Sequence, residues 1–276
     1  MLKGKNMKNK IAKWALLALC AVAQADEAPI GVFDSGSGGL SVYRELVKIL
    51  PKEQYVYYAD NAHCPYGEKT AAYIQDRARE ITRILRERGT DIIVVACNTA
   101  TGAAIGTLRA EFPEFPFIGM EPAVKPAALG TRSGVIGVLA TAGTLKASKY
   151  LLTKGRYEAN VQIVEHVGKG FVELVENGIL SGPEAEETVR KSLQPLLDAG
   201  ADRIVLGCTH YPFLKPVIEA IAGPGVQIID PAPAVARQTV RMLEKDCIPM
   251  DEGPFSIDLY FSGEPDSLQR IYKLIK

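Results

Sequence analysis

Residues 91–105 read DIIVVACNTATGAAI, and residues 201–214 follow the same pattern as ADRIVLGCTHYPFL. In each copy an aspartate precedes a cysteine by six residues, and an apolar run separates the two. The cysteines are Cys97 and Cys208, and a Pro-Ala-Val triplet follows each of them by 25 residues. The chain is therefore a duplication, and we expect its halves to fold as a pseudo-symmetric pair that brings one thiol from each half to a shared site.

Short apolar runs alternate with amphipathic helical patterns from residue 29 onward. Because these runs are continuously apolar, they are typical of parallel strands that helices cover on both faces. The sequence predicts an α/β fold with two pseudo-symmetric three-layer domains, mostly parallel sheets and an active site in the cleft between them. The predicted domains are residues 26–124 plus 234–276 and residues 125–233, and the predicted strands are 30–33, 55–59, 92–96, 135–139, 161–164, 204–206, 226–229 and an edge strand at 255–261.

The two halves differ beside their thiols. Ile30–Ser35 aligns with Ile136–Thr141, which places Asp34 opposite Ala140. The second half instead carries His210, two residues after its cysteine. We therefore expect equivalent thiol positions with different neighbouring groups. A separate local signal, Ser181 with Glu184, predicts a capping box at the start of a helix.

Composition excludes several classes of function. The 276-residue chain has a formal net charge of +0, which argues against a nucleic-acid-binding protein, since such proteins carry a basic surface. Its three histidines and five cysteines show neither metal-ligand spacing nor a disulfide framework. The glycine-rich turn at 36–39 lacks the G-x-G-x-x-G and P-loop patterns, so nucleotide binding is not expected. No motif points to a Schiff-base cofactor, and we expect neither a metal nor a cofactor.

The N-terminal 25 residues form a separate segment. Several lysines precede an apolar run at residues 14–23, and Ala23-Gln24-Ala25 matches an A-x-A cleavage site. This three-part pattern is typical of a secretory signal peptide, and the run is shorter than the ~20 residues of a membrane span. The alternative is an N-terminal extension that never leaves the cytoplasm. In either case residues 1–25 are excluded from the fold, and no membrane association is expected of the mature protein.

Cys97, Cys208 and the pair Asp34-Ser35 all fall at carboxyl ends of predicted strands, where α/β proteins bind ligands. Each also precedes a predicted helix start, whose free N–H groups attract carboxylates and lower the pKa of a thiol. Two thiols on opposite sides of one carbon could remove a proton from one face and return one to the other, as in a racemase or epimerase. A carbon about 3–3.5 Å from each sulfur places the sulfurs roughly 7 Å apart, too far for a disulfide.

Five segments, in this order, resemble the aspartate/glutamate racemase family: FDSGSGGLSV (33–42), PYGEK (65–69), ACNTA (96–100), FVELVENG (171–178) and GCTHYP (207–212). The resemblance implies cofactor-independent interconversion of L- and D-glutamate in the cytoplasm, with the D form used for peptidoglycan synthesis. It also implies acid/base roles for two thiols, assisting roles for three further groups and a set of substrate-binding residues. The two thiols are Cys97 and Cys208, and the assisting groups are Asp34, Glu176 and His210. The substrate-binding residues are Asp34, Ser35, Tyr66, Gly67, Asn98, Thr99, Thr209 and His210.

Two other functions remain open from the sequence. Another acidic amino-acid racemase, acting on aspartate, would use the same thiols. An exported two-lobed amino-acid-binding protein would fit the leader, although it needs no matched thiols. The partner expected in every case is a small molecule, with glutamate as the first choice, and a homodimer is the expected assembly. Cys64 and Cys247 lack a partner in the repeat, so we expect no chemistry from them.

Overall fold

The computed structural model describes residues 28–246, 248, 250 and 254–275, so the predicted leader at 1–25 lies outside the described residues. The described residues form two sheets, with strand orders β4-β3-β1-β2-β9 and β6-β5-β7-β8, and each pairing is parallel. The predicted α/β fold with parallel sheets is confirmed. The strands are β1 (Ile30–Asp34), β2 (Gln54–Ala59), β3 (Ile92–Val95), β4 (Phe117–Gly119), β5 (Val135–Ala140), β6 (Gln162–Val167), β7 (Arg203–Gly207), β8 (Gln227–Ile229) and β9 (Ser256–Phe261).

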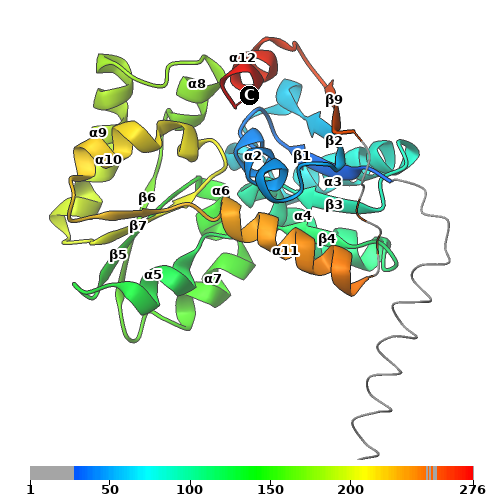
Figure 1. Cartoon of the computed structure of the whole chain (residues 1–276). Helices are drawn as coiled ribbons and strands as arrows, with labels where there is room; N and C mark the ends of the chain where they lie inside the picture. Colours follow the sequence, from blue (N-terminus) through cyan, green and yellow to red (C-terminus); the bar gives the residue numbers. More distant parts are fainter. Residues whose placement is uncertain (1–27, 247, 249, 251–253, 276) are drawn as a thin grey trace, which may run out of the picture.

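Helices connect the strands and cover both sheets (Figure 1). The α-helices are α2 (Leu40–Ile49), α3 (Ala71–Glu87), α4 (Asn98–Glu111), α5 (Val124–Gly130), α6 (Ala142–Lys146), α7 (Ser148–Gly155), α8 (Phe171–Glu176), α9 (Pro183–Asp198), α10 (Lys215–Ala222), α11 (Ala232–Lys245) and α12 (Asp266–Ile275), with short 3-10 helices η1 (Asn61–His63), η2 (Tyr66–Glu68) and η3 (Tyr211–Leu214). Within the described residues, no helix has both the length and the apolar composition that crossing a membrane requires.

The predicted capping box at Ser181 and Glu184 is wrong. Helix α9 begins at Pro183 with Gly182 as its N-cap, and no side chain caps it. Proline suits the first helical position because it has no N–H to satisfy and its φ is already helical. Gly182, at φ 88°, adopts a conformation that an L side chain disfavours, so Pro183 and Gly182 set this helix start.

Strand register confirms the duplication. The first four strands of the two sheets have equivalent orders, β4-β3-β1-β2 and β8-β7-β5-β6, and β9 adds an edge strand to the first sheet. Ile30 of β1 lies opposite Ile92 of β3, and Ile136 of β5 lies opposite Arg203 of β7. The sequence alignment of the halves matches these same residues. The two halves thus repeat the pairing of their strands as well as their sequence.

The chain crosses between the sheets twice. Helix α5 follows β4 of the first sheet but contacts β5 and β7 of the second. Helix α11 follows β8 of the second sheet but contacts α2 and β4 of the first, and it runs across the lower side of the molecule in Figure 1. We therefore propose that the domain boundaries lie at these crossings, at 124/125 and 233/234.

Each sheet separates two cores, as a three-layer arrangement requires. Along β3, Ile92 and Val94 contribute to the core shared with α2, whereas Ile93 and Val95 contribute to the core shared with α3 and α4. All four side chains are at most 1% exposed. Since β3 has one core on either side, its residues are all apolar, and its continuous apolar run is explained.

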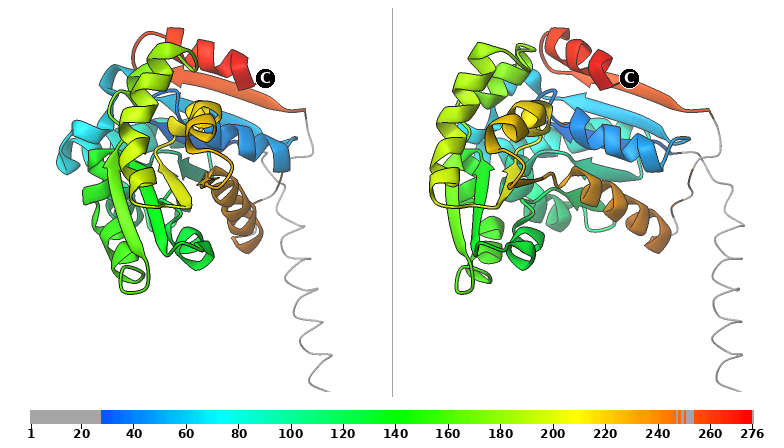
Figure 2. Two further views of the ribbon diagram at one scale, coloured as in Figure 1. Left: turned by 90° about the vertical axis from the view of Figure 1, so that its left-hand side faces the viewer. Right: turned by 60° about the vertical axis from the view of Figure 1, so that its left-hand side comes forward.

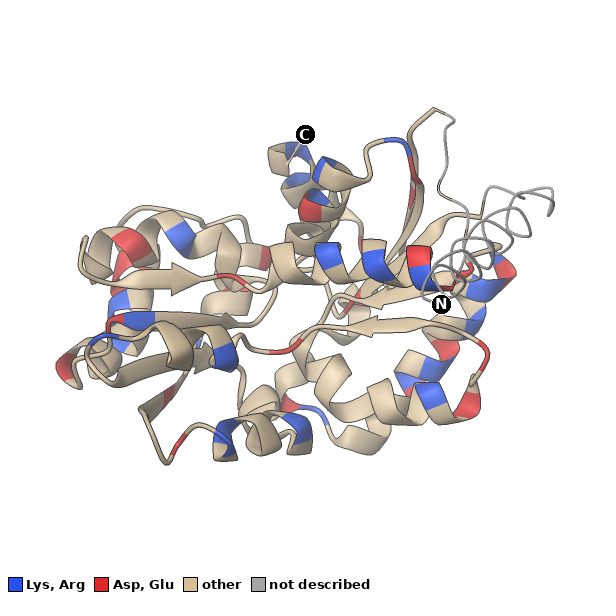
Figure 3. Ribbon diagram, turned by 60° about the horizontal axis from the view of Figure 1, so that its bottom comes forward, with Lys and Arg blue, Asp and Glu red and all other residues tan. Residues whose placement is uncertain are grey.

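The C-terminal helix α12 was not expected from the sequence. It contacts α2 of the first half and α8 of the second, and Figure 2 shows it beside the green helices at the top of the molecule. Both acidic and basic residues occur on the described helices (Figure 3), in keeping with the formal net charge of +0.

Candidate active site

The central strands of both sheets end at one buried site. Asp34 is the last residue of β1, Cys97 lies two residues after β3 and Cys208 directly follows β7. Their exposed fractions are 0%, 4% and 7%. Both thiols are free, and the negative charge of an ionised Cys208 contributes to raising the pKa of Cys97, so the two sulfurs are within electrostatic reach of each other. Both cysteines thus follow central strands of the two sheets, and they are not bonded to each other.

The first thiol is the N-cap of α4. Cys97 Sγ accepts the N–H of Ala100 at 3.4 Å and donates toward Ser35 Oγ at 3.7 Å. Burial, followed by the charge of Asp34, nevertheless raises the pKa of Cys97 well above its usual value. A helix N-terminus stabilises a thiolate by about 0.3–1 kcal/mol. Full burial destabilises it by up to roughly 4–7 kcal/mol, which corresponds to a rise of about 3–5 in the pKa. The prediction of a lowered pKa at Cys97 is therefore wrong, and its resting form is the protonated thiol.

Asp34 lies between the two halves of the site. Its Oδ2 accepts the N–H groups of Gly39 at 2.8 Å and Gly36 at 3.2 Å, and its Oδ1 accepts the Thr209 hydroxyl at 3.4 Å. Burial raises the pKa of Asp34, although the positive charge of His210 acts in the opposite direction. Asp34 thus shares a hydrogen-bond network with the segment that carries the second thiol, while its charge acts on the first.

The second thiol begins a chain of three groups. Cys208 Sγ lies 3.8 Å from His210 Nδ1, and His210 Nε2 lies 2.7 Å from Glu176 Oε1. Burial opposes both charges of the imidazole–carboxylate pair, but the hydrogen bond with His210 and its positive charge lower the pKa of Glu176 to about 2. Hydrogen bonds with Cys208, Cys64 and Glu176 raise the pKa of His210 well above 6.5. We therefore assign a charged His210–Glu176 pair, which presents an N–H group toward Cys208.

The environments of the two thiols are less alike than expected. A helix was predicted to start directly after each cysteine, and α4 does so after Cys97. After Cys208, however, Thr209 and His210 intervene before the short helix η3 begins at Tyr211. The second thiol therefore has the imidazole of His210 beside it in place of a helix N-terminus.

The glycine-rich turn allows the His210–Glu176 pair to approach the first domain. A Cβ atom on Gly38 would lie 2.3 Å from His210 Nδ1, and one on Gly36 would lie 2.4 Å from Glu176 Oε1. The next residue, Ser37, donates its N–H and its hydroxyl to Glu176 Oε1 at 2.8 and 3.0 Å. The glycines at 36 and 38 are thus explained by close packing against these two side chains.

Among the predicted substrate-binding residues, Asn98 is the one best placed to receive a ligand. Its side chain is 3% exposed, and neither its Oδ1 nor its Nδ2 has a hydrogen-bond partner within the described part of the chain. Leaving a buried polar group unsatisfied costs about 1–3 kcal/mol. A bound molecule with both donors and acceptors, such as an amino acid, would satisfy this amide.

Two other predicted binding residues, Thr99 and Gly67, contact the second half of the chain. The Thr99 hydroxyl lies 2.8 Å from that of Thr141, across the two sheets. A Cβ atom on Gly67 would be 3.0 Å from Thr141 Cβ, so η2 also meets the second half here. The Tyr66 hydroxyl donates to Asp60, which directs it into the first domain.

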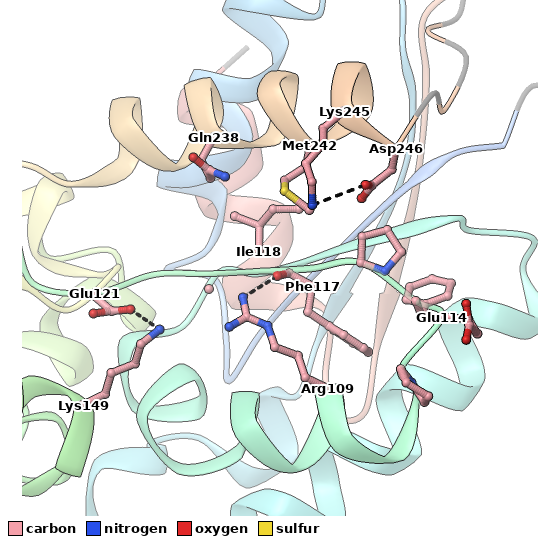
Figure 4. Close-up of a pocket in the computed structure, with 14 residues that line it drawn as sticks. Arg109, Glu114, Phe117, Ile118, Glu121, Lys149, Gln238, Met242, Lys245 and Asp246 are labelled. Carbon is pink, nitrogen blue, oxygen red and sulfur yellow. Dashed lines mark hydrogen bonds and ion pairs between the residues drawn. The ribbon is translucent and has the colours of Figure 1, made fainter. Parts of the chain in front are cut away.

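Some cavities lie beside these residues and others lie away from them. One of about 230 Å³ lies between η2 and the ends of β5 and β6, with Gly67, Thr141 and Gly168 in its wall. Another, of about 680 Å³, lies between β4, α7 and α11 and contains none of the predicted site residues. Figure 4 shows its lining, including an ion pair of Lys149 with Glu121.

Cys64 belongs to the site's surroundings, although it has no partner in the repeat. One ligand atom from each of Cys64, Glu176 and His210 lies within 4.8 Å of the others. The sequence spacing indicated no metal-ligand cluster among the histidines and cysteines, and these three residues nevertheless lie close together in the fold. Their separation in sequence concealed the grouping, and the one available signal was the position of Cys64 directly before the PYGEK segment.

The fold and the site together define a two-domain parallel α/β protein in which each domain supplies one buried thiol. A carboxyl group accompanies the first thiol, and a charged imidazole–carboxylate pair accompanies the second.

The chain belongs to the Asp/Glu/Hydantoin racemase family, whose model matches residues 30–239, and it is therefore an isomerase. A glutamate racemase from Pseudomonas entomophila is 47% identical over 250 residues, covering 90% of this chain and 94% of that protein. The structure of Francisella tularensis glutamate racemase with D-glutamate has a TM-score of 0.78 at 29% identity, covering 91% and 94% of the chains. That of the Escherichia coli enzyme with L-glutamate and the activator UDP-MurNAc-Ala has a TM-score of 0.79 at 33% identity, covering 90% and 94%.

Proposed function

We propose that this protein is a glutamate racemase that inverts the α-carbon with two thiols and no cofactor. The observation that carries the proposal is the pair Cys97 and Cys208, two buried free thiols at equivalent ends of the duplicated fold. Their distinct helpers support it, because inversion needs one base and one acid at the same time. Relatives that are named glutamate racemases, and the complexes of two of them with D- and L-glutamate, support glutamate as the substrate.

The proposed proton path is symmetric in outline. In one direction Cys208, as the thiolate, removes the α-proton from one face of glutamate, and the Cys97 thiol donates its own proton to the opposite face. The enzyme then holds a Cys208 thiol and a Cys97 thiolate, which is the form that acts on the product enantiomer. Each positioned acid or base contributes about 10²–10⁴-fold to such a reaction.

Fixed polar groups would stabilise the carbanion that forms between the two proton transfers. The N-terminus of α4 carries free N–H groups beside Cys97 and would attract the substrate carboxylate. The unsatisfied amide of Asn98 follows directly in sequence. Because these groups are already ordered and buried, little reorganisation is needed during the reaction.

The test is to incubate the purified protein with L-glutamate in heavy water. We expect α-deuterium in the D-glutamate formed, with loss of optical activity followed by circular dichroism. A panel that includes aspartate tests the specificity, and Cys97→Ser and Cys208→Ser should each lose racemisation. Wild-type turnover in either variant would contradict the two-thiol mechanism. Tight glutamate binding without α-exchange would favour an amino-acid receptor instead.

The cellular role follows from the product. We infer that D-glutamate made by this enzyme is used in peptidoglycan synthesis and that the enzyme works in the cytoplasm. Determining the N-terminal sequence of the protein from its native cell tests this location. A mature start at Asp26 would mean that the protein is exported and would contradict the cytoplasmic assignment.

A further inference from the structure

Three potential metal ligands converge beside the second thiol. Cys64 follows η1, Glu176 ends α8 and His210 precedes η3, yet one ligand atom from each lies within 4.8 Å of the others. The position of Gly36 shows the same convergence, because a Cβ atom there would lie 2.4 Å from Glu176 Oε1 and 3.1 Å from Cys64 Sγ. A set of three protein ligands with an open fourth position is the arrangement of many accessible zinc sites.

The donor types define which ions would fit. A thiolate and an imidazole favour soft or borderline cations such as Zn²⁺, whereas Mg²⁺ and Ca²⁺ need sets of oxygen ligands. On a tetrahedral zinc ion, sulfur and nitrogen ligands lie about 3.6 Å apart. The ligand atoms, which lie within 4.8 Å of one another, would thus move together by about an ångström at most. With Nε2 as the His210 ligand, its 2.7 Å contact with Glu176 would lengthen to about 3.3 Å.

An acidic cavity leads to this cluster. It has a volume of about 410 Å³, and both Cys64 and Glu176 are part of its wall. Three further carboxylates line it, those of Glu173, Glu264 and Asp266, and Arg270 supplies a positive charge. A concave surface with an excess of negative charge concentrates cations near it. An ion from solvent can therefore reach Cys64 and Glu176 through this cavity.

We propose that Cys64, Glu176 and His210 form an inhibitory site for a soft divalent cation of the zinc type. On binding, the Cys64 thiol and the His210 imidazolium each lose one proton to solvent, and the cation takes the freed nitrogen of His210 and an oxygen of Glu176 as ligands. The imidazole–carboxylate pair is then no longer available to Cys208, so racemisation stops until a chelator removes the ion. The inhibition rests on the proposed racemase function, whereas the binding of the ion does not.

Binding is tested with Zn²⁺ alone on the reduced, metal-free full chain, by isothermal titration calorimetry. We expect one ion per chain and at least tenfold weaker binding in Cys64→Ser, since losing even an indirect metal partner costs about 10–100-fold. The matched control is Glu173→Gln, which alters the same cavity but leaves the three ligands in place and should still bind one ion. Bound Co²⁺ should show a thiolate charge-transfer band that Cys64→Ser lacks.

Measurements of racemase activity provide the second test of the proposal. Zn²⁺ should inhibit the wild-type enzyme reversibly, with EDTA restoring turnover and Mg²⁺ having no effect, while Cys64→Ser stays active and resists Zn²⁺. If Cys64→Ser does not fold, protection of wild-type Cys64 from alkylation by Zn²⁺, read by mass spectrometry, replaces it. The proposal would be overturned if the protein did not bind Zn²⁺ stoichiometrically or if Cys64→Ser bound Zn²⁺ as tightly as the wild type. It would also be overturned if Zn²⁺ did not protect Cys64 from alkylation. Zn²⁺ binding in a protein without racemase activity would refute only the proposed function.

Discussion

Replacing Glu176 with glutamine tests the link between the His210–Glu176 pair and the second thiol. Glutamine keeps the shape of the side chain and removes its charge. In the native protein Glu176 Oε1 accepts hydrogen bonds from His210 Nε2 at 2.7 Å and from the N–H and hydroxyl of Ser37 at 2.8 and 3.0 Å. The substitution therefore removes the counter-charge of His210 while leaving an oxygen that can still accept from Ser37.

The size of the effect follows from the pKa of Glu176, which falls from 4.5 to about 2. That difference corresponds to about 3 kcal/mol of preference for the charged form. It is an upper bound for the pair, because the side chain is 18% exposed and hydrogen bonds from Ser37 and Ser267 also lower this pKa. Without the Glu176 carboxylate, His210 loses one of the hydrogen bonds that raise its pKa, so the pKa of His210 falls. If losing the pair raises the barrier to proton transfer at Cys208 by this amount, kcat/KM should fall by about 100-fold, because about 1.4 kcal/mol corresponds to a factor of ten in rate.

Isotope effects show which thiol is affected. The two enantiomers have equal free energy, so kcat/KM must fall equally in both directions. With α-deuterated substrates, however, Glu176→Gln should increase the isotope effect for the enantiomer whose proton Cys208 removes and bring that for its mirror image toward unity. Asp34→Asn, which alters the Cys97 side, should give the opposite pattern. Equal isotope effects in both directions, or a rate loss below threefold, would refute the reasoning.

The same variant predicts a pH dependence of stability. Because the folded pKa of Glu176 is depressed, its contribution is present above pH 4.5, the ordinary pKa of a glutamate, and is lost as the pH falls toward about 2. The difference in free energy of unfolding between wild type and Glu176→Gln should therefore shrink over this range in urea titrations. A difference independent of pH would show that Glu176 is not charged in the fold.

Three further substitutions test other parts of the site and its support. Gly38→Ala places a Cβ atom 2.3 Å from His210 Nδ1, so kcat should fall by about 100-fold or more in steady-state assays, whereas Gly106→Ala, with open space at its Cβ, should not change it. Asn98→Ala should raise KM without lowering stability to urea, because the amide has no partner in the described fold; a loss of stability would contradict this. Arg77→Met leaves the fully buried Asp60 carboxylate without its ion pair to Arg77 and should cost about 3–5 kcal/mol in urea unfolding; a cost below 1 kcal/mol would show that the hydrogen bond from Tyr66 is enough to stabilise this carboxylate.

Local sequence determined the elements and the thiol positions. Helix α3, for example, buries Ile74, Ala78, Ile81 and Leu85, a helical spacing that is visible in the sequence. Gly89, at φ 80°, follows its end, as glycine commonly does after a helix. The repeat also implied that Cys97 and Cys208 would follow equivalent strands, because residues that match in a duplication take equivalent places in the two sheets. These features depend on neighbours a few residues apart.

Tertiary structure decided the chemistry around each thiol. The elevated pKa of Cys97 reflects burial and the charge of Asp34, neither of which the helix-start pattern contains. Glu176 reaches His210 and a turn 139 residues earlier in the chain, and Cys64 joins them only through folding. Desolvation and Coulomb interactions depend on distance in space, not on separation in sequence. The sequence alone therefore located the two thiols, and the tertiary structure decided their charge environment and neighbours.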